Sequence, residues 1–359
     1  MSNASLLING LAYEGWESVD VKRAIDAVSG AFSLTLSERW AGNDKPWQIK
    51  PGDSCELRLD NLTVLTGYVD SISPSYSGTT HTVTVTGRDK AADMVDCSAV
   101  HKPDQWTNYT LLQLATTLGA PFGIKAKALT SVGGKFPLVK LEHGEMAWAA
   151  LERHCRQRGV LAYSDGVGGL VLTTVGTKRA QAALVAGDNI LSASGTLDNS
   201  QRFSRYIVKG QAAGSSDAYD AESSAHIESQ FTDGSIKRYR PLIVMADGQS
   251  TIASARTRAI WEKTVRAGRA ISATITVQGW RQVPNGRLWD INELVEVSAP
   301  WLQIQGTMLI SEVAFSKSSA GTLTDITISS PDAFSAEPEE AAKAKKKASD
   351  KTGNPWEAT

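Results

Sequence analysis

Residues 67–100 read GYVDSISPSYSGTTHTVTVTGRDKAADMVDCSAV, and this stretch says most about the fold. Val83 and Val85 alternate with threonines, which is the two-residue period of a strand buried on one face. Segment 62–72 predicts an extended strand, and the proline-, serine- and glycine-rich segment 73–80 predicts a turn between the two strands. Gly87 is predicted to end the second strand. The stretch therefore favours an antiparallel β structure.

A charged group follows Gly87 directly. Arg88, Asp89 and Lys90 precede small and apolar residues, and this pattern predicts one or two helical turns. Asp89 is suited to capping the start of that helix, and Arg88 or Lys90 to pairing with Asp93 or with a neighbouring subunit. A binding site is the alternative. We favour the structural role because the group matches no active-site motif.

Residues 1–101 predict a first β domain. Leucine and phenylalanine alternate with polar residues at 32–36 and again at 57–59, and Asp60-Asn61 predicts a tight turn into the next strand. A small antiparallel barrel or sandwich is the natural way to bury one face of many short strands.

Residues 102–178 predict an α+β insert. One helix carries Leu111, Leu114, Ala115 and Leu118, with Asn108 or Thr110 as its cap and Gly119 at its end. A second helix is expected from about 145 to 158, with Gly159 as its stop. A hairpin over 160–173 follows.

Residues 179–335 predict a second β domain with one helix and a long loop. The clearest strand is 271–277, where apolar and polar residues alternate strictly. Segment 211–235 is rich in Gly, Ser, Ala and Asp, and is predicted to be a long mobile loop. Further strands are expected near 203–209, 294–297, 307–315 and 322–328, and a helix over 250–266.

Residues 336–359 predict a disordered polar tail. Alanine, glutamate and lysine dominate it, so it offers no apolar face for packing. Trp356 is its one large apolar residue, and is the part of the tail best suited to docking on a neighbouring protein. An idle solvated end is the alternative.

The composition indicates an ordinary folded protein of two or three domains. The chain has 359 residues, 42% of them hydrophobic and 21% charged. Its formal net charge of −1 argues against a dedicated nucleic-acid binder. The three cysteines are odd in number and far apart, which favours reduced thiols. We expect synthesis and folding in the cytoplasm, because no signal peptide or membrane span is recognisable.

The sequence offers little support for catalysis. His154 and Cys155 are adjacent on a predicted helix, so they point about 100° apart and do not form a nucleophile–base pair. The five histidines show no metal-ligand spacing, and Gly133-Gly134-Lys135 lacks the spacing of a phosphate loop. We expect no enzyme activity, no metal and no cofactor.

Arginine and tryptophan are the residues most suggestive of contacts. Four arginines lie in or just after the helix expected at 250–266, and a solvated or subunit-facing helix is favoured over a nucleic-acid surface because no aromatic residues are interleaved. The chain has ten tryptophans, a residue type that anchors cores and interfaces. Trp289 is a candidate of this kind.

Several blocks together resemble one protein family. They are GYVDS at 67–71, VTVTGRDKAAD at 83–93, RFSRYIVKG at 202–210 and GRLW at 286–289, and they occur in the expected order. These blocks are similar to the baseplate hub proteins of phage Mu and related contractile-tailed phages, and to the hub part of type VI secretion spike proteins.

The resemblance implies an α+β, mainly β fold with two small β-barrel domains separated by the insert, assembled as a ring-shaped homotrimer. Such a trimer would present six similar barrels to a tail tube or distal tail protein, carry a spike protein, contact baseplate wedge proteins and leave a channel. Genome DNA would pass through that channel without sequence-specific binding, and no membrane insertion is implied. The protein would lie in the virion baseplate, after assembly in the host cytoplasm.

Two other functions are the alternatives. A cell-wall hydrolase would need a block of sequence that the hub blocks do not already occupy, and only the short tail remains. A carbohydrate-binding tail module would fit the strands and the tryptophans, but it would not explain the ordered blocks.

Overall fold

The structure is a computed structural model that describes residues 3–37, 49–78, 81–176, 178–211, 227–249 and 251–335. The predicted tail at 336–359, with Trp356, and most of the loop predicted at 211–235 lie outside these residues. Strands dominate and helices are few, so the α+β, mainly β class is confirmed.

The first β region forms where the sequence alternates. Phe32 and Leu34 are buried on β4, and Val83 and Val85 on β7, as their alternation predicts. Asp60 and Asn61 both have positive φ, which is the tight hairpin turn expected between β5 and β6. The strands are β1 (Ala4–Ile8), β2 (Leu11–Tyr13), β3 (Ser18–Ala24), β4 (Ala31–Ser37), β5 (Ser54–Leu59), β6 (Leu62–Tyr76) and β7 (His81–Asp89).

Two predictions in this region are wrong. β7 does not end at Gly87 but continues to Asp89, because the glycine serves close packing: a Cβ atom there would lie 2.3 Å from the Tyr68 carbonyl oxygen and 2.5 Å from the Phe32 ring. β6 runs through the predicted turn to Tyr76. It contains Pro74, which is tolerated because this half of the strand pairs only with β7 and leaves the other edge free among the described residues.

The insert follows β7 and has its own hydrophobic cluster. Thr110 caps α2 in a reciprocal capping box with Gln113, and Gly159 ends α3 in the left-handed conformation, both as predicted. The elements are α1 (Ala91–Asp96), β8 (Gln105–Tyr109), α2 (Leu111–Gly119), η1 (Ala120–Phe122), β9 (Lys125–Ala128), β10 (Phe136–Lys140), α3 (Ala147–Arg158), β11 (Leu161–Ser164) and β12 (Gly169–Thr173).

The second β region is built from two stretches of sequence. One precedes and the other follows a separate compact unit at Phe203–Lys263. The strict alternation at 271–277 becomes β19, with Ala273, Ile275 and Val277 buried. The elements are β13 (Lys178–Arg179), β14 (Leu184–Val185), β15 (Ile190–Leu197), β19 (Ile271–Gln278), β20 (Glu293–Ala299), η2 (Pro300–Leu302), β21 (Ile304–Ser318), β22 (Gly321–Ser329) and η3 (Pro331–Phe334).

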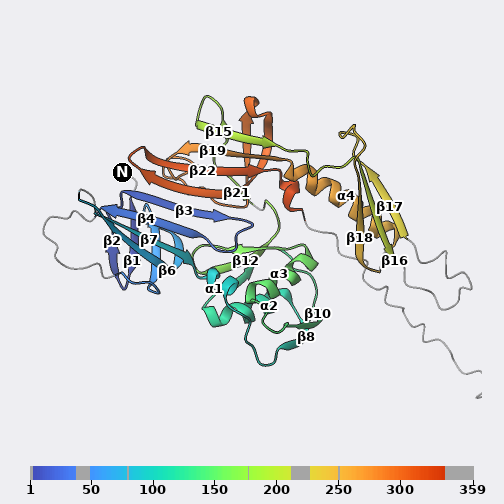
Figure 1. The fold of residues 1–359 in the computed structure, drawn as a ribbon, viewed down its shortest axis with the longest axis horizontal. Helices are drawn as coiled ribbons and strands as arrows, with labels where there is room; N and C mark the ends of the chain where they lie inside the picture. Colours follow the sequence, from blue (N-terminus) through green and yellow to red (C-terminus); the bar gives the residue numbers. More distant parts are fainter. Residues whose placement is uncertain are drawn as a thin grey trace, which may run out of the picture. The chain divides into compact units, whose positions relative to one another are not determined.

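The two β regions have the same strand order. In the first, five consecutive strands pair in the order β3-β4-β7-β6-β5; in the second, five strands pair in the order β15-β19-β22-β21-β20. Every one of these pairs is antiparallel. The regions are joined where β3 pairs with β21 (Figure 1). The chain therefore contains an internal structural repeat, although we see no close repeat in its sequence.

The repeat extends to local detail. The long strands β6 and β21 each carry a register shift, at Val69/Ser71 and at Ile310/Glu312. A short helical segment follows the last strand of each repeat, α1 after β7 and η3 after β22. These matches align β3, β4, β7 and the end of β6 residue by residue with β15, β19, β22 and the end of β21. The β5–β6 pair differs, because its register shift at Leu57/Arg58 has no counterpart between β20 and β21.

A pair of buried positions shows how the repeats differ. Phe32 lies opposite Gly87 in the first repeat, whereas Ala273 lies opposite Ile328 at the matching place in the second. The large side chain is on the first strand of the pair in one repeat and on the second strand in the other. Each arrangement fills the core with one large and one small residue.

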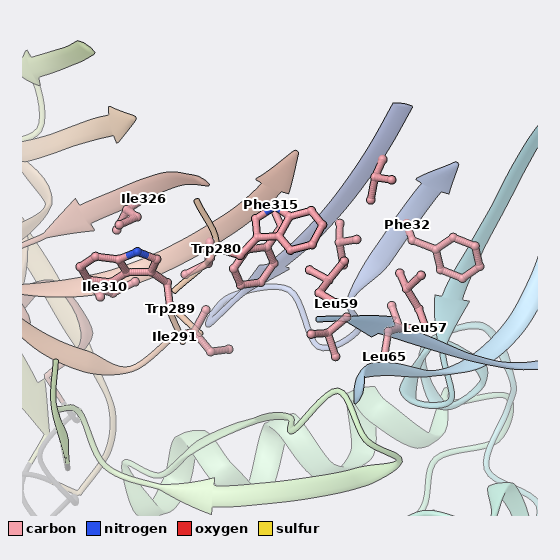
Figure 2. Packing of buried hydrophobic residues seen from close by; sticks show 14 of the residues in the cluster. Phe32, Leu57, Leu59, Leu65, Trp280, Trp289, Ile291, Ile310, Phe315 and Ile326 are labelled. Carbon is pink, nitrogen blue, oxygen red and sulfur yellow. The ribbon is translucent and has the colours of Figure 1, made fainter. Parts of the chain in front are cut away.

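One hydrophobic cluster runs through both repeats. Figure 2 shows Phe32, Leu57 and Leu65 from the first repeat and Phe315 and Ile326 from the second. All five are buried. The pairing of β3 with β21 and this shared cluster make the repeats one structural unit.

A second compact unit spans Phe203–Lys263. In it β16 (Arg205–Gln211) pairs with β17 (Ile227–Thr232) and β18 (Pro241–Gln249), and α4 (Ile252–Arg269) contributes Ala255 and Ala259 to a small core (Figure 1). The prediction of a loop up to 235 is wrong at its end, because residues 227–232 pair with β16 as a strand.

Candidate assembly surfaces

The charged group after Gly87 is an ion-pair cluster on the surface of the first repeat. The Arg88 guanidinium donates to a carboxylate oxygen of Asp70 at 2.7 Å and to one of Asp96 at 2.8 Å. The hydrogen bonds that Arg88 donates to these two carboxylates raise its pKa. The side chain is more than a third exposed, so each pair adds little to stability within the chain.

Asp89 is buried and has a structural role. Its carboxylate accepts hydrogen bonds from the Gly30 N–H at 2.8 Å and from the Ala91 N–H at 2.9 Å, at the start of α1. Desolvation by burial raises the pKa of this carboxyl, while the hydrogen bonds from Gly30, Ser164 and Ala91 oppose the rise. Asp89 therefore ties the loop before β4 to α1 and to β11.

Lys90 and Asp93 lie beside this cluster. Lys90 occupies the position before α1, and its backbone N–H donates to the Thr66 carbonyl. Burial is the main cause of a raised pKa at Asp93, and Arg88 opposes it. Among the described residues Arg88 pairs with Asp70 and Asp96 rather than with Asp93. A contact with another subunit stays a prediction for Arg88, Asp89, Lys90 and Asp93.

The tryptophans divide between core and surface. Trp289 is only 2% exposed and belongs to the central cluster (Figure 2), whereas Trp301 in η2 is 95% exposed. Within the chain Trp289 is thus a packing residue. Trp301 is the stronger surface candidate.

Within the part of the chain that the structure describes, His154 and Cys155 form no catalytic pair. The His154 ring meets the Ala150 carbonyl at 2.7 Å, and burial raises the pKa of Cys155 to about 12, so this thiol is protonated near neutral pH. Among the described residues no three His, Cys, Asp or Glu side chains are grouped so as to hold a metal ion, and no helix is long and apolar enough to cross a membrane.

One arginine of α4, Arg258, is engaged within its own helix. Arg258 pairs with Glu262 at 3.1 Å, one helical turn away, and its guanidinium lies 4.7 Å from the Trp261 ring centre. These contacts are those of a helix surface with its own ion pairs.

Two strands of the repeats are exposed over much of their length. β15 is exposed along most of its length, and β6 is mostly exposed after Val69, ending in Tyr76 at 84% exposure. Sequence reasoning missed both. β15 (ILSASGTL) lacks a clear alternation, and the exposed end of β6 was read as a turn.

Three family models match successive parts of the chain. Residues 3–89 match the "Mu phage baseplate assembly protein GpP-like, N-terminal" model, residues 91–174 match "Baseplate hub protein gp44-like, second domain", and residues 251–337 match "Mu phage baseplate assembly protein GpP, fourth domain". The first falls on the first repeat and the second on the insert, while the third covers α4 and the later strands of the second repeat, β19 to β22.

Individual relatives agree with these models. The baseplate hub protein gp44 of Escherichia phage Mu is 36% identical over 321 residues, which is 87% of this chain and 84% of that protein. The 43 kDa tail protein of prophage MuSo2 from Shewanella oneidensis is 37% identical, with a TM-score of 0.83 over 94% of this chain and 100% of that one.

A more distant likeness concerns the fold alone. The E. coli c3393 protein, a component of the type VI secretion system, is 10% identical, with a TM-score of 0.53 over 90% of this chain and 76% of that one. With the close match to gp44 along most of its length, the chain belongs to the family of phage Mu baseplate hub proteins.

Proposed function

We propose that this chain is the structural hub of a contractile phage tail baseplate, acting as a homotrimer that joins the tail tube to the spike. The names of its relatives, a baseplate hub protein and a prophage tail protein, support a structural role in the tail. The trimer leaves an axial channel through which the genome passes without sequence-specific contacts.

The internal repeat carries this proposal. Because both repeats share one strand order, a single chain supplies two similar β modules, and three chains supply six. Six similar modules around an axis match a sixfold tail tube, while the same ring has only threefold symmetry for a trimeric spike. Each module is proposed to be barrel-like in the assembled ring.

In this proposal the chain is divided into two β modules, an insert and a tail. Residues 1–101 and 179–335 hold the two modules, 102–178 form the insert and 336–359 form a separate tail. Partners are the tube or distal tail protein, the spike and the baseplate wedge proteins. The protein assembles in the host cytoplasm and then resides in the virion baseplate.

As a hub, the chain is a scaffold without catalytic activity. Its homologues are structural baseplate proteins by name, and the buried, protonated Cys155 and the scattered histidines offer no nucleophile or metal centre among the described residues. A cell-wall hydrolase and a carbohydrate-binding module are the rival functions.

Light scattering coupled to size-exclusion chromatography tests the proposal. The expected mass is three times the 38.4 kDa of one chain, across a wide concentration range. Three copies should also appear in a reconstruction of the tail. A protein that stays monomeric at high micromolar concentration would overturn the hub, and clearing of peptidoglycan in a zymogram would favour the hydrolase.

A further inference from the structure

Two strand edges at opposite ends of the repeat pair carry no partner strand among the described residues. Apart from an isolated bridge between Ile190 and Ala186, β15 pairs with β19 along one edge only, and residues 71–76 of β6 pair with β7 along one edge only. Both edges carry exposed large side chains, with Leu191 and Leu197 more than half exposed on β15 and Tyr76 at 84% on β6. Unpaired edges of this kind are templates for a strand from another chain.

The joint between the two repeats shows which strand fits. β3 of the first repeat pairs antiparallel with β21 of the second, over six residue pairs from Glu312–Ala24 to Lys317–Val19. In the shared strand order β15 stands where β3 stands, and β6 stands where β21 stands. The two free edges are therefore the counterparts of the two edges that are already paired within the chain.

We propose that β15 of one chain pairs antiparallel with residues 71–76 of β6 in a second copy, repeating the β3–β21 joint between chains. The proposal rests on the hub function, since it names the contact that closes the trimer. Because the contact joins two different surfaces, it is head-to-tail, and it closes into a ring when the rotation between copies is a third of a turn.

The internal repeat also fixes the register. Val21 pairs with Phe32, and Gly195 pairs with Ala273, which stands at the Phe32 position of the second repeat. The long strands β6 and β21 can be aligned by their register shifts, and in this alignment Pro74 corresponds to Phe315. Since Phe315 pairs with Val21, Pro74 is opposite Gly195 of the next chain. Ser75 is then opposite Ser194, and Ile72 is opposite Leu197.

The backbone of β15 is oriented for this pairing. The Asp198 N–H donates to the Ala270 carbonyl at 2.8 Å on the β19 side. Successive residues of a strand direct their N–H and C=O groups to alternate edges. The free edge of β15 therefore carries the N–H and C=O groups of Ala193, Gly195 and Leu197.

Proline at the other edge sets a limit on the ladder. Pro74 has no N–H, so the proposed ladder has one donor fewer than the β3–β21 ladder, a feature tolerated at strand edges. Gly195 opposite it has no side chain, and the Leu302 side chain lies 3.4 Å from the place of its missing Cβ, so the proline ring would pack beside Leu302.

Disulfide cross-linking tests the register. Residues directly opposite in such a ladder have Cα atoms about 4.5–5.5 Å apart, within the range that a disulfide spans. The variant combines Ser75→Cys and Ser194→Cys with Cys97→Ser, because Cys97 is the exposed native cysteine while Cys55 and Cys155 are buried. After oxidation, covalent trimers are expected on a non-reducing gel, and neither single-cysteine variant should form them.

A matched pair within the chain controls the chemistry. Asp20 and Ser316 are the counterparts of Ser194 and Ser75 in the β3–β21 joint. Asp20→Cys with Ser316→Cys, in the same Cys97→Ser background, should oxidise within one chain and leave the gel mobility monomeric. This control shows that the oxidation conditions suit a pair of this geometry.

A proline substitution separates strand pairing from mere proximity. Ala193→Pro removes an N–H that faces the free edge and leaves the β19 ladder intact, so it should lower the cross-linked fraction of the Ser75→Cys/Ser194→Cys variant. Ala193→Val keeps the N–H and should cross-link fully. Equal cross-linking in the proline and valine variants would overturn the proposed pairing.

Light scattering on the same samples distinguishes this failure from failure of the hub function. A trimer that does not cross-link refutes the β15–β6 contact and leaves the hub standing. A chain that is monomeric at every concentration refutes both.

Discussion

Replacing Gly87 by alanine tests the close packing at the centre of the first repeat. An alanine Cβ would lie 2.3 Å from the Tyr68 carbonyl oxygen and 2.5 Å from the nearest atom of the Phe32 ring. Both distances are far below contact distance. The ring can rotate away in part, but the carbonyl belongs to the backbone of β6, so β6 and β7 must separate by about 1 Å to reach ordinary van der Waals contact near 3.5 Å.

Opposing free-energy contributions decide whether Gly87→Ala stabilises or destabilises the protein. Burial of one methyl group contributes about 0.8 kcal/mol, and loss of unfolded-state freedom about 0.4–1 kcal/mol, both favouring alanine. Forcing a methyl into a packed core costs about 1–3 kcal/mol, and two stretched ladder hydrogen bonds cost about 1 kcal/mol each. We therefore expect Gly87→Ala to lower the free energy of unfolding by about 1–4 kcal/mol.

Urea denaturation followed by circular dichroism measures the change, with thermal unfolding as a second readout. For a unit of this size each kcal/mol shifts the Tm by about 2–4 °C, so a fall of about 2–16 °C is expected. Gly134→Ala is the matched control. That glycine is exposed, has nothing within 4 Å of its added Cβ, and should raise stability slightly or leave it unchanged.

A double variant separates the two obstacles. Phe32→Leu relieves the ring contact and leaves the Tyr68 carbonyl in place, so Phe32→Leu/Gly87→Ala should remain less stable than Phe32→Leu alone. A Gly87→Ala protein as stable as the wild type, or a double variant with no residual cost, would refute the argument that backbone approach requires this glycine.

Further outcomes are expected at other positions. Thr110→Ala removes the capping box of α2 and should cost about 1 kcal/mol, whereas Thr116→Ala, which loses only a bond to a carbonyl of its own helix, should be close to neutral in the same melts. Because the folded chain raises the pKa of Asp89 above its ordinary value of 3.8, the stability from this group is present below that value and falls as pH rises through the folded pKa; Asp89→Asn should lose this part of the pH dependence in denaturation series at stepped pH. Asp89→Ala strands two buried N–H groups and should cost about 2–4 kcal/mol at neutral pH, a loss that unchanged melting would contradict. Arg88→Ala breaks two exposed pairs and should cost less than about 1 kcal/mol, with a smaller difference from wild type in high salt.

Patterns that depend on neighbouring residues in the sequence were predicted well. The alternation around Val83 and Ile275 identifies strands with a buried face, and Thr110 and Gly159 mark helix ends, because caps and one-sided burial are local requirements. The Asp60-Asn61 turn was found for the same reason.

Features set by distant partners could not be read from the chain. Gly87 was interpreted as a strand end because the Phe32 ring that covers it lies far away in sequence. β15 and β17 are short of alternating residues, and they exist as strands through their pairing with β19 and β16. At the surface, sequence reasoning selected Trp289, which is buried, and missed the edges of β6 and β15, since edge position is a property of the sheet.

The exchanged large and small residues in the two repeats have a consequence for folding fidelity. Strands of equal topology can in principle trade places, within one chain or between copies being made together. A β4 strand set against β22 would press Phe32 onto Ile328, and a β19 strand set against β7 would leave Ala273 facing Gly87 across a void. Both errors are penalised, one by crowding and the other by a cavity. The size difference between the paired residues thus favours correct strand pairing in each repeat, although the two repeats share one architecture.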